Sequence, residues 1–138
     1  MKIEDTSNLE ELMAQLGYPA SKDELQQRFH QLLQLPLYYT AVAEIEGELA
    51  GFVGMCKQWA YEFDKPYVRI LALVVHEKYR RQQIGQALME HAINWAQHQG
   101  CTSITLNSGN REERRAAHVF YESLGFVGKS TGYSKRLE

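Results

Sequence analysis

The stretch from Val68 to Ala96 constrains the fold of this 138-residue chain more than any other. It reads VRILALVVHEKYRRQQIGQALMEHAINWA, an apolar run followed by a short basic turn and an amphipathic pattern. Ile70–Val75 is continuously apolar, as expected of a central strand covered on both faces. Apolar residues within 83–99 recur at helical spacing, and Gly100 ends the pattern. The stretch therefore predicts a buried strand that leads into a helix.

The turn between this strand and this helix reads Arg80-Arg81-Gln82-Gln83-Ile84-Gly85. Backbone N–H groups at a helix N-terminus have no acceptor within the helix, and the aligned peptide dipoles leave partial positive charge there. A phosphate is a natural ligand for such a position. The turn therefore predicts an anion site, although arginine-rich helix starts also occur as solvated surface.

The segments before this unit predict two helices and a β-hairpin. Ser21 and Glu24 have the spacing of a capping box, which marks the start of the second helix. Gly51 and Gly54 interrupt the second arm of the hairpin, which indicates a bulge or a close backbone approach. In chain order we expect helices over 7–16 and from 21 to about 34, strands over 39–45 and 49–59, and a loop over 60–66.

The segments after it predict a second strand–helix pair. Residues 101–107 have the pattern of a strand, and a strand–helix–strand order implies a parallel pair with a right-handed crossover. A helix over 111–124 ends at Gly125, and closing strands follow at 126–127 and 132–137. We therefore predict a single α/β domain over residues 1–138, with a mixed sheet that is antiparallel in its first half and carries helices on both faces.

Composition excludes several classes of protein. The net charge of −2 argues against nucleic-acid and membrane-surface partners, which favour an excess of Lys and Arg. No apolar run approaches the roughly eighteen residues of a membrane span, and MKIEDTSNLE does not resemble a signal peptide, so we expect a cytoplasmic protein. Cys56 and Cys101 lie far apart, and no ligand spacing indicates a metal.

Two phrases resemble the GNAT superfamily of acetyl-CoA-dependent N-acetyltransferases. They are YRRQQIGQAL after the central strand and AHVFYESLGF, which spans Ala117 to Phe126. In that family the turn has the form [QR]xxGx[GA]; Arg80 fills the first position, Gly85 the last, and Gln83 replaces the middle glycine. We reason that a helical backbone at Gln83 does not require glycine, so its N–H remains a donor. The resemblance implies a centrally splayed GNAT sheet and acetyl-CoA as cosubstrate, with no metal.

The resemblance also implies roles for individual residues. Tyr121 is the implied general acid that protonates the departing thiolate. The backbone of Leu73 and Val75 pairs with the pantetheine arm, and the Val74 amide donates to the acetyl oxygen. The implied contacts of the pyrophosphate are Arg80, Arg81, Gln82, Gln83, Gly85 and Gln86.

The acceptor side leaves several assignments open. Many relatives carry a glutamate on the central strand as general base, where this chain has Leu71 and Ala72. A base must then come from the Tyr61–Asp64 loop, from His76, from His118 or through ordered water. Glu62, Asp64 and His118 are also candidates for acceptor binding.

These observations predict acetyl transfer from acetyl-CoA to a primary amine of a small molecule, by direct attack in a ternary complex. The alternative is a non-catalytic acyl-CoA-binding or regulatory module, which the absent glutamate and Gln83 keep open. A nucleic-acid-binding domain that uses the arginines is disfavoured by the net charge. Members of the family often form homodimers, so a homodimer is open for this chain too.

Overall fold

A computed structural model describes residues 9–80, 82–107, 115–129 and 132–137. Arg81 and the segment 108–114, which holds the start of the predicted fourth helix, lie outside the described residues. The chain divides into two compact units, Met1–Thr105 and Leu106–Glu138. The predicted anion turn and central strand belong to the first unit, and Tyr121 belongs to the second.

Two helices open the first unit, and their ends follow the local sequence signals. The helix α1 spans Leu9–Leu16 and is followed by Gly17 at φ 106°, a left-handed conformation that suits glycine. The helix α2 spans Lys22–Leu33. At its start the Ser21 hydroxyl accepts the Glu24 N–H, and the Glu24 carboxylate accepts the Ser21 N–H. The predicted capping box is therefore confirmed.

The sheet has the order β1-β2-β3-β4, and its first three strands are antiparallel as predicted. Their bounds are Tyr38–Ile45, Glu48–Gln58 and Tyr67–Val75. The register between β2 and β3 shifts after Gly54, so that Leu71 is the extra residue of a bulge on β3. A Cβ atom on Gly51 would lie 2.6 Å from the Val74 carbonyl oxygen. The two glycines thus mark a close backbone approach and a bulge, as expected from the sequence.

The crossover to the last strand runs through α3, which spans Ile84–His98. The strand β4 spans Ile104–Leu106. Backbone hydrogen bonds join the start of β3 to the residues that precede β4. Thr102 N–H donates to the Pro66 carbonyl, and Val68 N–H donates to the Ser103 carbonyl. Because both residue numbers rise together, the pair runs parallel. A strand of three residues can pair with only part of the nine-residue β3.

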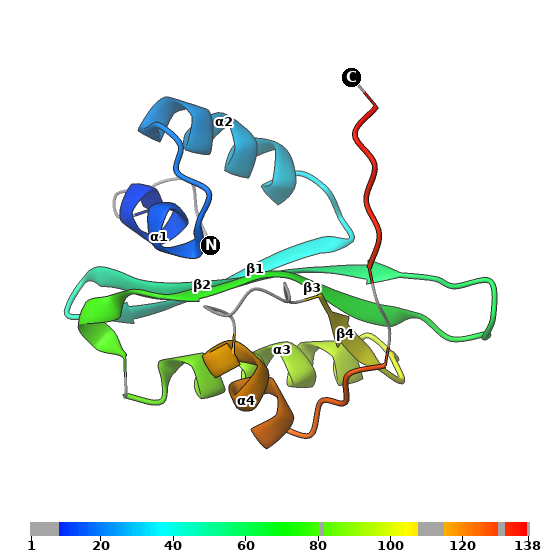
Figure 1. Cartoon of the computed structure of the whole chain (residues 1–138). Coiled ribbons are helices and arrows are strands. Elements are labelled where there is room, and N and C mark those ends of the chain that lie inside the picture. Colours follow the sequence, from blue (N-terminus) through cyan, green and yellow to red (C-terminus); the bar gives the residue numbers. More distant parts are fainter. Residues whose placement is uncertain (1–8, 81, 108–114, 130–131, 138) are drawn as a thin grey trace. The chain divides into compact units, whose positions relative to one another are not determined.

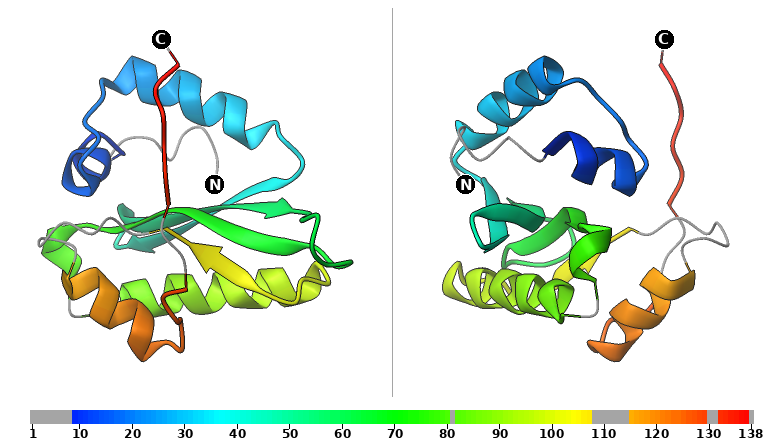
Figure 2. Two further views of the ribbon diagram at one scale, coloured as in Figure 1. Left: turned by 45° about the vertical axis from the view of Figure 1, so that its right-hand side comes forward. Right: turned by 90° about the vertical axis from the view of Figure 1, so that its left-hand side faces the viewer.

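Helices cover both faces of the sheet in the first unit. Figure 1 shows α1 and α2 on one face and α3 on the other, and Figure 2 shows the same layering from two further sides. The core between α1, α2 and the sheet is built from buried apolar residues that include Leu12, Phe29 and Phe52. The α3 helix buries Leu88, Met89 and other residues of its apolar stripe. The predicted α/β class and layering are therefore confirmed.

The second unit contains the helix α4, which spans Arg115–Ser123 and ends at Gly125 with φ 92°. The predicted closing strands were wrong for the described part of this region, since 126–129 and 132–137 contain no strand. A strand requires a pairing partner, which local sequence cannot specify. As for membranes, a span would need a longer and more apolar helix than any that the described residues form.

Candidate functional site

The predicted anion turn lies between a short 3-10 helix and α3. The 3-10 helix η2 spans Glu77–Tyr79, and Arg80 after it is extended, with φ −65° and ψ 155°. The first bond inside α3 joins Ala87 N–H to the Gln83 carbonyl at 3.0 Å. The amides of Ile84, Gly85 and Gln86 therefore have no acceptor within the helix. The first turn of α3 has no acidic residue that would compete for them. These amides can receive an anion.

The conformation of Gln83 differs from the helical one expected from the sequence. Gln83 is the N-cap of α3 and lies in the left-handed region, with φ 61° and ψ 22°. A side chain at such a position meets steric strain that glycine avoids. The prediction of a helical backbone at Gln83 was therefore wrong. The chain turns left-handed before the helix begins, and Gln83 carries the resulting strain.

The 3-10 helix η2, which directly precedes the turn, is held in place by contacts with other residues of the first unit. Tyr79 is buried, and its hydroxyl donates to Glu48 Oε2 at 2.5 Å. Lys78 Nζ lies 3.4 Å from the same oxygen. The Tyr79 bond, followed by the Lys78 charge, holds the pKa of the Glu48 carboxyl below its usual value. The amide of Glu77 donates to Gln15 of α1. The turn is thus tied to α1 and to the β1–β2 hairpin.

The backbone of β3 presents alternate residues to its two neighbours. His76 N–H donates to the Ala50 carbonyl at 2.7 Å, so in an antiparallel pair Val74, two residues earlier, also directs its amide and carbonyl toward β2. The amides of Leu73 and Val75 point to the opposite edge. The Val75 carbonyl faces the same edge as the Val75 amide, and it accepts a hydrogen bond from Arg80 Nε at 3.4 Å and not from β2. The geometry supports the predicted edge contacts of Leu73 and Val75, and does not support Val74 as an amide donor there.

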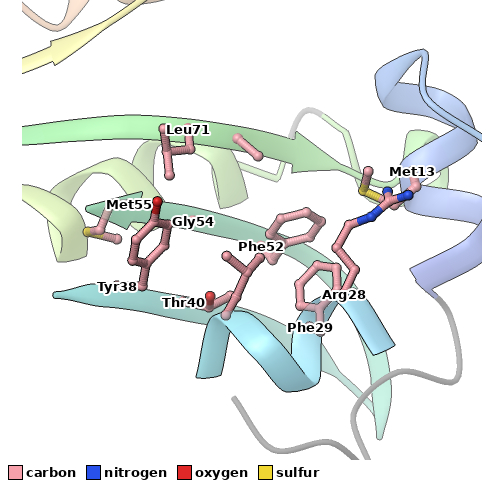
Figure 3. Close-up of a pocket in the computed structure, with 11 residues that line it drawn as sticks. Met13, Arg28, Phe29, Tyr38, Thr40, Phe52, Gly54, Met55 and Leu71 are labelled. Atoms are coloured by element: carbon pink, nitrogen blue, oxygen red, sulfur yellow. The ribbon is translucent and has the colours of Figure 1, made fainter. Parts of the chain in front are cut away.

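A cavity of about 120 Å³ lies on the α1 and α2 face of the sheet, beside the β3 bulge. Figure 3 shows its walls, which come from both helices and three strands. No pattern in the sequence predicted this cavity. The apolar residues of α2 that line it match a core stripe, and no local signal distinguishes a cavity wall from a filled core. The lining residues are Met13, Arg28, Phe29, Leu32, Tyr38, Thr40, Phe52, Gly54, Met55, Leu71 and Ala72.

The structure does not bring Glu62 and Asp64 to this cavity. Both are exposed in the loop before β3 and neither lines the cavity. The rise along a strand places Leu73 about 20 Å from Tyr67, the first residue of β3. Figure 1 shows the two ends of β3 at opposite sides of the view. These carboxylates therefore lie far along the strand from the predicted cofactor contacts.

Both ring nitrogens of His76 have partners, which disfavours its predicted role as a base. Nδ1 accepts the Lys78 N–H at 3.1 Å, so the neutral ring carries its proton on Nε2. Nε2 lies 2.5 Å from Glu11 Oε2. The ring has no lone pair left to accept a proton from an amine. His76 instead links α1 to the end of β3.

Tyr121 and His118 lie on α4, three residues apart and therefore on neighbouring positions of one helix face. Both are half-buried. The Tyr121 ring packs edge-on against Phe120 and Phe126, with centroid distances of 5.5 and 6.1 Å. As for metals, no three His, Cys, Asp and Glu side chains in the described residues form a group that could hold an ion.

Comparisons with known proteins agree with this architecture. The model of the acetyltransferase (GNAT) family matches residues 5–126. Human N-acetyltransferase 8 is 34% identical over 98 residues, which are 67% of this chain but only 39% of that protein. A Bacillus subtilis protein named for ribosomal protein alanine N-acetyltransferase activity is 26% identical over 91% of this chain and 76% of its own length.

The fold is shared with a solved structure of similar length. A GNAT family acetyltransferase from Staphylococcus aureus superposes with a TM-score of 0.84 at 31% identity, over 98% of this chain and 91% of that one. The family interpretation of the two sequence phrases is therefore confirmed. This chain belongs to the GNAT family of acetyltransferases, enzymes that use acetyl-CoA.

Proposed function

We propose that this chain transfers the acetyl group of acetyl-CoA to a primary amine of a small molecule, within one N-acetyltransferase domain. The observation that carries the proposal is the cavity beside the β3 bulge. Its walls include Leu71 and Ala72, and the next residue, Leu73, directs its backbone to the edge where the pantetheine arm is expected. A cavity of about 120 Å³ suits part of a small acceptor.

The residues of the turn fit a pyrophosphate. The amides of Gly85 and Gln86 have no acceptor within α3, and the residues Arg80, Gln82 and Gln83 that precede them are exposed. Arg81 shares the proposed role but lies outside the described residues. Arginine charge and helix-terminal amides both favour a bound phosphate.

The proposed chemistry is direct attack in a ternary complex. When bound, acetyl-CoA supplies the thioester; a C–N bond forms, the C–S bond breaks, and the thiolate leaves. Backbone amides at the outer edge of β3, on Leu73 and Val75, stabilise the charge that develops on the acetyl oxygen, in place of Val74. Tyr121, assigned by the family resemblance, protonates the thiolate. The proton of the amine leaves through ordered water or His118.

The test is release of CoA thiol with a panel of amines. The panel includes a peptide with an N-terminal alanine, because one relative is named for that acceptor. We expect a small amine to accelerate thiol release over the enzyme alone. Tyr121→Phe removes the proposed acid and lowers kcat by about 10²- to 10⁴-fold, while KM for acetyl-CoA changes little. Acceleration by the peptide alone would overturn the small-molecule assignment.

The second candidate function is a module that binds acyl-CoA without turnover. It is favoured by the strained Gln83 and by Leu71, an apolar residue in the region where many relatives have a glutamate. Under this alternative the chain binds acetyl-CoA, but no amine in the panel accelerates thiol release. The same assay therefore separates the two functions.

A further inference from the structure

We propose that the cavity selects, as acetyl acceptor, a small amine that carries a carboxylate and an apolar side chain of about four to six heavy atoms. This inference rests on the proposed function, because it names the acceptor of that reaction. Three observations carry it, and they concern the walls of the cavity, its size and its charge.

The walls of the cavity are mostly apolar. Figure 3 shows Phe29 and Phe52 at its centre, with Leu71 above them and Met13 at one end. Phe52 and Met55 are almost fully buried, so the strand wall is held in place by the core behind it. Polar atoms come from Tyr38 and Thr40 of β1 and from Arg28. Apolar walls of this kind favour a hydrocarbon group over a hydroxylated or charged one.

The size of the cavity limits the group that can enter. Its volume of about 120 Å³ is somewhat below that of an engineered cavity of about 150 Å³ that binds benzene. A branched aliphatic side chain of four carbons fits this space. An aminosugar ring system or a long polyamine is larger than this space and would extend out of its open side.

Charge selects the rest of the acceptor. Arg28 is the one charged residue among those that line the cavity, and none of the lining residues is acidic. The carboxylate of Glu24, one turn earlier on α2, accepts the Ser21 N–H, and this bond comes before the nearby Arg28 charge among the causes that lower the pKa of Glu24. No salt bridge within the described part of the chain includes Arg28. The guanidinium therefore favours an anionic group and disfavours an acceptor with a second positive charge.

The experiment compares three amines of similar size in the thiol-release assay. Leucine has the proposed apolar side chain and carboxylate, leucinamide lacks the carboxylate, and asparagine replaces the apolar side chain by a polar one. We expect kcat/KM, calculated for the unprotonated amine, to be highest for leucine. The preference over leucinamide is about two- to fivefold, the range of an exposed ion pair, because Arg28 is exposed.

Arg28→Gln removes the charge, and we expect the leucine-to-leucinamide ratio of kcat/KM to fall about two- to fivefold below that of the wild type. Lys22→Gln is the matched control, since Lys22 is an exposed cation of the same helix that does not line the cavity. It keeps the wild-type ratio. An unchanged ratio in Arg28→Gln would overturn the carboxylate assignment. Equal kcat/KM for asparagine and leucine would overturn the apolar one.

Failure of the proposed function gives a different result. In that case none of the amines releases thiol, and the cavity is tested by binding instead. Leucine should then raise the Tm of the wild-type protein and of Lys22→Gln equally, and raise that of Arg28→Gln less. A Tm that leucine does not raise in the wild type would overturn the inference itself.

Discussion

Gly51 on β2 and Val74 on β3 approach so closely that a Cβ atom at position 51 would lie 2.6 Å from the Val74 carbonyl oxygen. The same Cβ atom would lie 3.2 Å from Val75 Cα and 3.3 Å from a methyl group of Leu88. Two of these three neighbours are backbone atoms, so they cannot move aside as a flexible side chain does. The close approach therefore sets the position of the strand end that leads into the anion turn.

Gly51→Ala should destabilise the protein by about 1 to 3 kcal/mol, because the added methyl group forces β2 and β3 apart. The measurement is urea unfolding followed by circular dichroism. Gly54→Ala is the matched control on the same strand, since a Cβ atom there meets nothing within 4 Å. We expect that variant to lose no stability. Equal losses in the two variants would show that the contact with Val74 is not the cause.

Gln83→Gly should stabilise the protein by up to about 1 kcal/mol. Glycine removes the left-handed strain at φ 61° but gains entropy in the unfolded chain, so only part of the strain energy is recovered. Gln82→Gly is the control, because Gln82 is exposed and is not among the residues with positive φ. That variant should be less stable than the wild type. The Tm of each variant is compared with that of the wild type. A lower Tm in both variants would contradict the proposed strain at Gln83.

The bond between Tyr79 and Glu48 should make stability depend on acid pH. The pKa of Glu48 is lower in the folded protein than its ordinary value of 4.5. The ionised carboxylate therefore contributes fully to the free energy of unfolding above pH 4.5, and this contribution is lost as the pH falls through the folded pKa. Glu48→Gln should therefore flatten the decline of Tm below about pH 4.5. Tyr79→Phe removes the largest cause of the shift and should flatten it partly. A decline as steep as that of the wild type in Glu48→Gln would refute this assignment.

His76→Asn tests whether the ring serves structure or catalysis. The asparagine carbonyl can accept the Lys78 N–H as Nδ1 does, although the link to Glu11 is lost. We expect a modest fall in Tm and an unchanged shape of the kcat/KM profile between pH 5 and 9. Loss of a limb of that profile, with the Tm preserved, would identify His76 as the general base after all.

Much of the fold could be predicted because its signals are local. The capping box at Ser21 depends on residues three apart, and the end of α1 depends on Gly17 alone. The strand–turn–helix unit is visible because Ile70–Val75 and the stripe of α3 have different periods in one continuous stretch. Two short phrases in the same chain were enough to indicate the GNAT family.

The tertiary structure decided what depends on distant segments. Whether Val74 or Val75 turns its amide to the outer edge follows from the register against β2, which no residue near Val74 encodes. The cavity exists because Met13, Phe29 and Leu71 come from three elements that leave space between them. The sequence by itself therefore determined the family, the fold class and most of the helices and strands. Packing between elements determined which edge of β3 each backbone amide faces and where the cavity lies.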